Sequence, residues 1–165
     1  MHWLMLVLIV AVYAAIELRV LYPRGSVIRE GLKTLHFTLG LCIFALVWLR
    51  LTLRFTNRSP LIVPPPPRWQ LRIAHVVEFA IYVFMIAMPM LGWLTLSAEG
   101  KPISLFGLLL PALTGANEAL AGQAKEIHEL TGKAGYALLG VHALAALVHH
   151  YLQRDNTLRR MLPGV

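Results

Sequence analysis

Long apolar blocks separated by short polar segments dominate the pattern of residues along this chain. The blocks run from about 2 to 17, 34 to 53, 73 to 98 and 127 to 152. They show neither the alternation of a half-buried strand nor the narrow apolar stripe of a helix on a soluble domain. A helix of about 20 apolar residues crosses the hydrocarbon layer of a bilayer. The pattern therefore predicts an all-α, integral membrane four-helix bundle, organised as a single domain over residues 1–165.

Breaker residues mark the connections between these blocks. The segment Tyr22-Pro23-Arg24-Gly25 has turn chemistry. The four prolines from Pro64 to Pro67 cannot be helical, because each lacks an N–H, and they predict a stiff connector between the second and third spans. Pro89 is expected to kink or loosen the third span. The apolar segment 103–113 is too short to span, so we expect it to lie in the interface or to re-enter the membrane.

The composition agrees with a membrane solvent. Hydrophobic residues make up 58% of the chain, charged residues only 14%, and the mean hydropathy is +0.66, whereas soluble domains carry about a quarter charged residues. The net charge of +7 would suggest nucleic-acid binding in a soluble protein. Here the basic residues cluster between apolar blocks, which favours contact with lipid headgroups. We therefore expect membrane lipid as a partner and no nucleic acid. A single cysteine, Cys42, excludes a disulfide framework and covalent c-type haem attachment.

The distribution of basic residues predicts the orientation. The totals of Lys and Arg on the two sides are nearly equal, but the short connection between the second and third spans is dense in arginine and has no acid. These arginines are Arg50, Arg54, Arg58, Arg68 and Arg72. By the positive-inside rule this connection is cytoplasmic, and so are both termini.

Histidine is unusually frequent for so apolar a chain. The seven are His2, His36, His75, His128, His142, His149 and His150. A polar side chain inside a span is costly and usually faces the bundle interior or a function. Two axial imidazoles hold the iron of a six-coordinate electron-transfer haem.

The spacing of four histidines predicts two haem sites. His128 and His142 are 14 residues apart, so they share a helix face and lie ~21 Å apart along the axis. Matching depths pairs His36 with His128 around an outer haem and His2 with His142 around an inner haem. Histidines that merely cap a span in the headgroup region are the alternative.

Small residues accompany these histidines. Gly132 and Gly135 lie on the face of His128, and Gly40 follows His36 by one turn. We expect all three glycines to leave room for a flat macrocycle.

For the remaining three histidines we expect roles other than the pairing described above. His149 follows His142 by seven residues and is a candidate to hydrogen-bond a quinone carbonyl or to relay a proton, with headgroup contact as the alternative. His75 and His150 are interpreted as interfacial residues, although His75 is also an alternative ligand.

Short motifs along the whole chain match a known family in order and spacing. They are His2-Trp3, Ala14-Ala15-Ile16-Glu17-Leu18-Arg19, Tyr22-Pro23-Arg24, Ile62-Val63-Pro64-Pro65-Pro66-Pro67, Glu126-Ile127-His128-Glu129, Gly140-Val141-His142-Ala143, His149-His150-Tyr151 and the run from Asp155 to Pro163. Together they resemble the bacterial di-haem cytochrome b561 family, and the closing run is the most specific of them.

The resemblance implies an oxidoreductase of the bacterial inner membrane with two haem b groups. The family's four axial ligands carry over to His2, His36, His128 and His142. The family includes a superoxide oxidase, which passes an electron from superoxide at the periplasmic haem to ubiquinone. The resemblance implies a basic funnel outside, with Arg24, Arg29 and Lys33 as candidates, and a quinone pocket near the inner haem, with His149 as the candidate contact.

Two other functions remain open at this point. The chain is alternatively a haem-bearing membrane anchor that receives electrons from the iron–sulfur cluster of a partner, as in related subunits of hydrogenases and formate dehydrogenases. Its short loops offer little docking surface for such a partner. A haem-free structural or signalling membrane protein is the third class, and the oligomeric state is open in all three.

Overall fold

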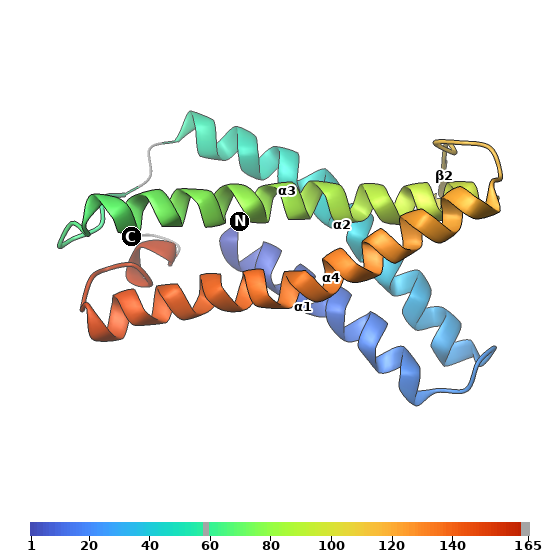
Figure 1. The fold of residues 1–165 in the computed structure, drawn as a ribbon, viewed down its shortest axis with the longest axis horizontal. Helices are drawn as coiled ribbons and strands as arrows, with labels where there is room; N and C mark the ends of the chain where they lie inside the picture. Colours follow the sequence, from blue (N-terminus) through green and yellow to red (C-terminus); the bar gives the residue numbers. More distant parts are fainter. Residues whose placement is uncertain (58–59, 163–165) are drawn as a thin grey trace.

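The computed structural model describes residues 1–57 and 60–162 and consists of four long helices (Figure 1). Among the described residues, these are the helices long and apolar enough to cross a membrane. The second, third and fourth of these helices begin before the predicted spans do. The helices are α1 (His2–Leu18), α2 (Val27–Thr56), α3 (Arg68–Ala98) and α4 (Glu118–Leu147), and a π-helical turn, η2 (Val148–Leu152), continues α4.

Local chemistry explains where these helices begin. Ser26 and Asn117 cap α2 and α4, since each side chain accepts a hydrogen bond from the backbone N–H three residues later, at 3.3 and 3.0 Å. Pro67 precedes α3, where a missing N–H costs nothing. Inside α3, Pro89 leaves one carbonyl without its helical hydrogen bond, but the helix continues to Ala98.

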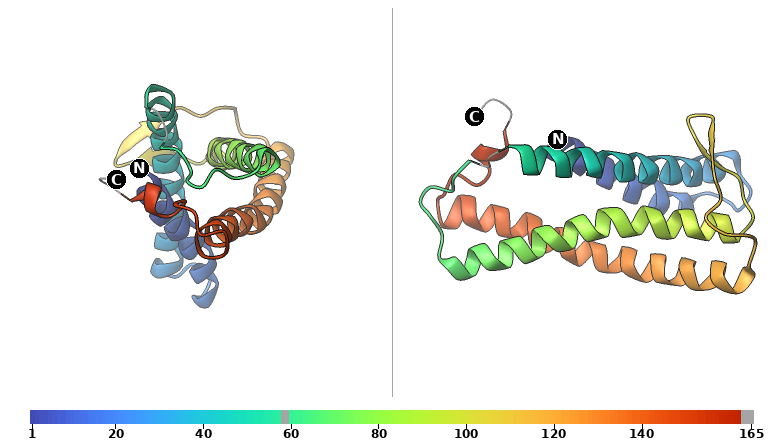
Figure 2. Two further views of the ribbon diagram at one scale, coloured as in Figure 1. Left: turned by 90° about the vertical axis from the view of Figure 1, so that its left-hand side faces the viewer. Right: turned by 90° about the horizontal axis from the view of Figure 1, so that it is seen from above.

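The helices pack in two layers. Figure 2 shows α1 beside α2 in one layer and α3 beside α4 in the other. Close backbone contacts join each helix to the next one in sequence, whereas α1 and α4 make no comparably close approach within the described chain. A small core occupies the middle of the bundle and contains Met5, Ile9, Ile43, Val47 and Met85. Large apolar side chains such as Val7, Phe79 and Leu130 are exposed on the outside, as lipid contact requires.

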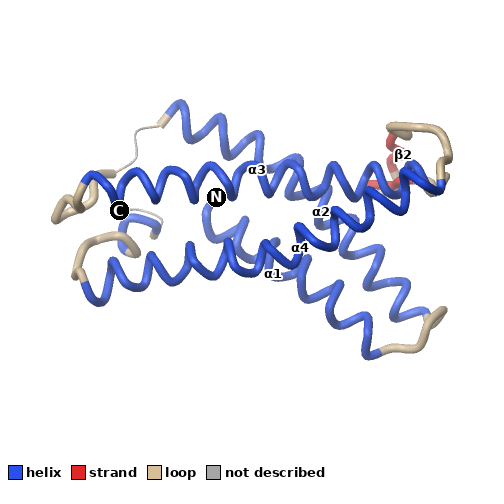
Figure 3. Tube along the Cα trace, viewed as in Figure 1, coloured by secondary structure: helices blue, strands red, loops and turns tan. Residues whose placement is uncertain are grey.

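The two ends of the bundle differ (Figure 3). One end, here termed the hairpin end, carries the antiparallel strands β1 (Ile103–Leu105) and β2 (Leu108–Leu110), which precede α4. The turn η1 (Arg19–Leu21), which joins α1 to α2, lies at the same end. The segment expected in the interface thus forms a hairpin, with positive φ at Phe106 and Gly107, as a two-residue turn of this kind needs. At the tail end lie the α2–α3 connector and the tail with η3 (Arg159–Met161). Arg58, counted in the predicted connector, lies outside the described residues.

A set of hydrogen bonds, here termed the tail clasp, fastens the C-terminal segment to the rest of the bundle. The Val63 N–H donates to Asn156 Oδ1 (2.9 Å), and Asn156 Nδ2 donates to the Leu61 carbonyl (3.2 Å). The Trp3 indole donates to the Met161 carbonyl (3.0 Å). The tail therefore holds both the polyproline connector and the first turn of α1.

Candidate functional site

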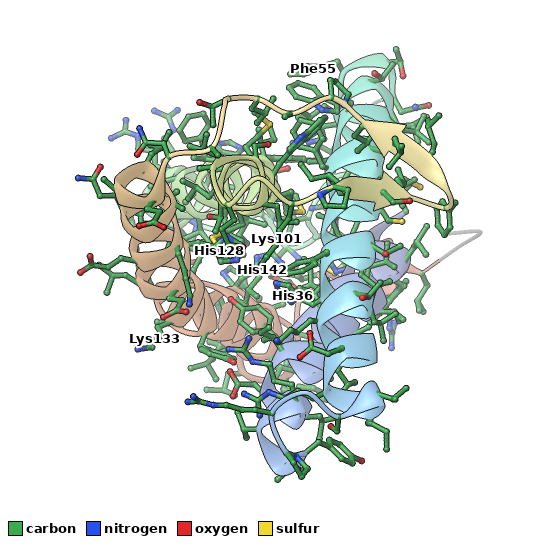
Figure 4. All side chains as sticks on the ribbon, turned by 90° about the vertical axis from the view of Figure 1, so that its right-hand side faces the viewer. His36, Phe55, Lys101, His128, Lys133 and His142 are labelled. Atoms are coloured by element: carbon green, nitrogen blue, oxygen red, sulfur yellow. The ribbon has the colours of Figure 1, made fainter. Side chains whose placement is uncertain are left out.

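The hairpin-end histidine pair consists of His36 on α2 and His128 on α4. Their ring centres are 6.1 Å apart, with planes inclined at 74°, and Figure 4 shows both side chains projecting into the space between the helices. His36 Nδ1 lies 3.0 Å from the Val12 carbonyl. Because a carbonyl only accepts, Nδ1 carries the proton, and Nε2 keeps its lone pair for another partner.

His128 is accommodated by a glycine on α3. A Cβ added to Gly92 would lie 3.4 Å from Cε1 of His128, so the small residue lets the ring lie close to the α3 backbone. Nδ1 of His128 is buried without a hydrogen-bond partner of ordinary geometry among the described residues, although the backbone of Met88 lies near this ring.

The tail-end histidine pair consists of His2 on α1 and His142 on α4. The ring centres are 6.2 Å apart, with planes inclined at 48°, and the Trp3 ring lies edge-on to His2 at 5.5 Å. The Arg50 charge acts on both imidazoles, and Arg50 Nε donates to the Tyr82 hydroxyl (3.2 Å).

Both pairs have the separation that a metal between two imidazoles requires. Two metal–nitrogen bonds of about 2 Å, and about 1 Å from each nitrogen to its ring centre, give roughly 6 Å. Within the described chain, no group of three or more His, Cys, Asp or Glu side chains is suited to a metal ion. Each pair offers two imidazole ligands at this separation, which suits a metal that brings its own equatorial ligands, as haem iron does.

A cavity of about 800 Å³ opens at the hairpin end and is lined by His36, His128 and Gly40, among others. Nothing lies within 4 Å of a Cβ added to Gly40, so this glycine borders open space. Seven basic side chains line this cavity, against three acidic ones, Glu17, Glu99 and Glu129. The seven, here termed the basic rim, are Arg19, Arg24, Arg29, Lys33, Lys101, Lys125 and Lys133.

Arg24, Arg29 and Lys33, the candidates from the sequence for a basic funnel, all belong to the basic rim but differ in their contacts. Arg29 Nη1 donates to the backbone carbonyls of η1 and its flank at 3.1 and 2.9 Å, and Lys33 pairs with Glu30 at 2.7 Å. For Arg24, the described residues supply no hydrogen bond or ion pair. Sequence reasoning missed Arg19, Lys101, Lys125 and Lys133 as cavity residues, because the fold gathers them from separate segments.

The middle of the bundle, between the two histidine pairs, is filled by protein. Gly135 lies seven residues from both His128 and His142. A Cβ there would collide with the Tyr13 hydroxyl and lie 2.5 and 2.7 Å from ring carbons of Phe84. The expectation that Gly135 leaves room for a macrocycle is therefore wrong, because aromatic side chains of α1 and α3 occupy that space.

His149 lies at the tail end in a polar network. Its Nδ1 donates to Asp155 Oδ2 (2.8 Å), and the Thr157 N–H donates to Oδ1 (2.8 Å). Burial by itself raises the pKa of Asp155, but these hydrogen bonds outweigh it and hold the pKa below its ordinary value. His150 Nδ1 donates to the Asp155 carbonyl (3.0 Å), and His75 is exposed on α3.

Comparison with known proteins identifies the family. The family model described as prokaryotic cytochrome b561 matches residues 1–164. The chain belongs to the prokaryotic cytochrome b561 family. It is 37% identical over 163 residues to cytochrome b561 homolog 1 of Escherichia coli K12, covering 99% of this chain and 93% of that protein. It is 39% identical over 162 residues to the probable superoxide oxidase CybB of Yersinia pestis, covering 98% and 91%. Cytochrome b561 homolog 2 of Escherichia coli K12 is 28% identical over 165 residues, with 98% and 86% covered.

Membership of the cytochrome b561 family, with four apolar helices, makes this a multi-pass protein of a bacterial membrane. The family implies b-type haem and electron transport as its general role.

Proposed function

We propose that this cytochrome b561 holds two haem b groups, one between His36 and His128 and the other between His2 and His142. The observation that carries this proposal is the separation of the two ring pairs, 6.1 and 6.2 Å. Bound there, haem b supplies a one-electron carrier. The Val12 carbonyl orients His36 for such a role, because it fixes the proton on Nδ1.

The proposed electron donor is superoxide, a small anion that reaches the hairpin-end cavity. The basic rim supports an anionic donor, since a cleft with an excess of positive charge concentrates anions near its opening. Arg24, Arg29 and Lys33 are the steering residues carried over from the sequence, and the relative named as a probable superoxide oxidase agrees with this choice.

The proposed acceptor is ubiquinone near the tail-end pair. The net reaction converts two superoxide ions, one quinone and two protons into two molecules of oxygen and one quinol. His149 is the candidate that hydrogen-bonds the quinone carbonyl. The Asp155 carboxylate fixes one proton of His149 on Nδ1. Nε2 can then take up a second proton, donate it in a hydrogen bond to the quinone carbonyl and transfer it as the quinone is reduced.

The proposed orientation places the tail end in the cytoplasm of a bacterial cell. The totals of Lys and Arg at the two ends are nearly equal, and the short α2–α3 connection supports this orientation by the positive-inside rule, because it is dense in arginine and has no acid. The arginines at this end are Arg50, Arg54, Arg58, Arg68 and Arg72, with Arg154, Arg159 and Arg160 in the tail.

The experiment exposes the detergent-purified protein to superoxide in the presence of a soluble ubiquinone analogue and follows the haem absorbance. Superoxide should reduce the haem, and quinone should reoxidise it, while superoxide dismutase suppresses both changes. Absence of haem reduction by superoxide would exclude this donor. Reduction without quinone-dependent reoxidation would exclude this acceptor.

A matched pair of variants tests the acceptor side. His149→Gln should slow quinone-dependent reoxidation at least about tenfold, since it removes a general acid, and should leave reduction by superoxide unchanged. His150→Gln is the control on the next residue. Equal effects of the two variants would remove His149 from the quinone site. A stoichiometric iron–sulfur partner that co-purifies with the chain would instead favour the anchor function.

A further inference from the structure

A second cavity lies at the tail end, apart from the histidine pairs. Its volume is about 300 Å³, and it lies where the polyproline connector, the end of η2 and the tail meet. Its lining consists of Val63, His150, Arg154, Asp155, Asn156 and Arg159. None of these lining residues is a proposed haem ligand or a proposed contact of the donor or the quinone, although Asp155 holds His149.

The cavity carries an excess of positive charge. The side chains of Arg154 and Arg159 have no hydrogen bond or ion pair with any of the described residues, and Asp155 is the only acid on the lining. Its carboxylate is already engaged, with one oxygen on His149 and the other on the Thr157 N–H. Among the described residues, the partner of this carboxylate in an ion pair is His149 and neither of the two arginines.

Arg154 occupies a position that normally selects glycine. Its φ is +57°, the left-handed conformation that ends many helices, and the Asp155 N–H beside it returns to the His149 carbonyl at 3.1 Å. A glycine adopts this conformation without the steric conflict that a Cβ brings. A long cationic side chain kept in a strained position points to a function of that side chain.

The walls around the two arginines are preformed. Asn156 is held on both sides by the connector through the tail clasp, and His150 Nδ1 is held by the Asp155 carbonyl. Such a cavity needs little reorganisation to accept a ligand.

We propose that this cavity binds the phosphate group of an anionic phospholipid. Two arginines suit a phosphate, because each guanidinium presents several donors to its oxygens. The nearby helix end exposes carbonyls, which disfavour an anion, so the arginine side chains must supply the attraction. The cavity lies where the candidate span that includes α4 ends, at Leu152. The end of a span is expected at the level of the lipid headgroups, which favours a lipid over a free ion.

The test compares the haem-loaded protein in nanodiscs of phosphatidylglycerol with the same protein in nanodiscs of phosphatidylcholine. Ligand binding to the folded state raises Tm, and we expect a rise of about 2–4 °C in phosphatidylglycerol. The double variant Arg154→Gln/Arg159→Gln should lose at least half of that rise. The control Arg68→Gln/Arg72→Gln removes the same charge at the same end, outside the cavity lining, and should keep it.

A second variant separates the ligand from folding. Arg154→Gly relieves the left-handed strain, so its Tm in phosphatidylcholine should equal or exceed that of the wild type, while its response to phosphatidylglycerol falls. Native mass spectrometry should find phosphatidylglycerol retained by the wild type and by the Arg68→Gln/Arg72→Gln control, and depleted in the Arg154→Gly variant.

Two results would overturn the proposal. One is an equal loss of the lipid response in both double variants, which would mean general surface charge. The other is a Tm rise of the same size with inorganic phosphate alone in phosphatidylcholine, which would mean a site for a free anion rather than for a lipid.

Discussion

At the scale of single residues, a hydrogen bond from His36 to the Val12 carbonyl joins α2 to α1 beside the hairpin-end pair. His142, at the other end of the bundle, belongs to a separate pair with its own neighbours, including Arg50. The two pairs share no contact, because the packing around Gly135 lies between them. Changes at one pair should therefore leave the other intact.

This separation gives the prediction for the proposed ligands. His36→Ala and His142→Ala should each lose one haem and keep the other, so each variant should bind about half the haem of the wild type. A redox-titrated optical spectrum of each purified variant measures this. The two variants should retain haems of different midpoint potential, since burial and hydrogen bonding differ at the two sites. Loss of both haems in each variant, or of neither, would contradict the pairing.

Gly135 gives a prediction for stability. Gly135→Ala should lower the free energy of unfolding by about 1–3 kcal/mol, because the new methyl group overlaps the Tyr13 hydroxyl and the Phe84 ring. Gly140→Ala is the matched control on the same helix, since nothing lies within 4 Å of its added Cβ. Thermal unfolding in detergent compares the two. Equal stability of both variants would show that Tyr13 and Phe84 move aside without cost.

At the scale of elements, the sequence predicted the four apolar helices but not every end. Charged residues in the first two turns of α2 made the predicted span begin at about residue 34; they are Arg29, Glu30 and Lys33. The helix itself begins at Val27, seven residues earlier, directly after the Ser26 cap. Helix length includes the polar turns outside the membrane, whereas an apolar block marks only the part within it.

The conformation of the segment 103–113 and the path of the tail were not predictable in the same way. The hairpin depends on positive φ at Phe106, a residue type with no preference for that conformation. The tail clasp depends on contacts of Asn156 with Val63 and Leu61, which precede it in the chain by 93 and 95 positions. The periodicity of apolar residues reports local secondary structure, whereas contacts between distant parts of the chain leave no period in the sequence.

The tail clasp gives a prediction at this scale. Asn156→Ala removes one acceptor and one donor that the connector uses, so the Val63 amide should exchange hydrogen faster, by about tenfold or more. Hydrogen–deuterium exchange of the connector measures this. Gln153→Ala is the control, because Gln153 is exposed and its side chain has no hydrogen bond to the described residues. An unchanged exchange rate at Val63 would mean that the prolines alone hold the connector.

At the scale of the whole molecule, the four histidines of the pairs could be singled out from the sequence because their spacing encodes depth in the membrane. The basic rim could not be assembled in this way. Lys101 lies beside the hairpin, while Lys125 and Lys133 lie on α4, and only the packing of the helices brings them around one cavity with Arg24. The electrostatic field at the cavity opening therefore belongs to the fold as a whole and not to any one segment.

That field gives the last prediction. If an anion is the donor, the second-order rate constant for haem reduction by superoxide should fall as ionic strength rises, because salt screens the basic rim. Arg24→Gln should lower this rate constant by about two- to threefold at low salt and flatten its salt dependence, since it removes one of the seven rim cations. Arg72→Gln, an equal charge change at the tail end, is the control and should change neither. A cationic reductant such as hexaammineruthenium(II) should show the opposite trend with salt, and should reduce the Arg24→Gln protein faster than the wild type. Stopped-flow absorbance measures all of these rates. If superoxide and the cationic reductant respond to salt in the same direction, the rim does not steer the donor, and the electrons enter elsewhere.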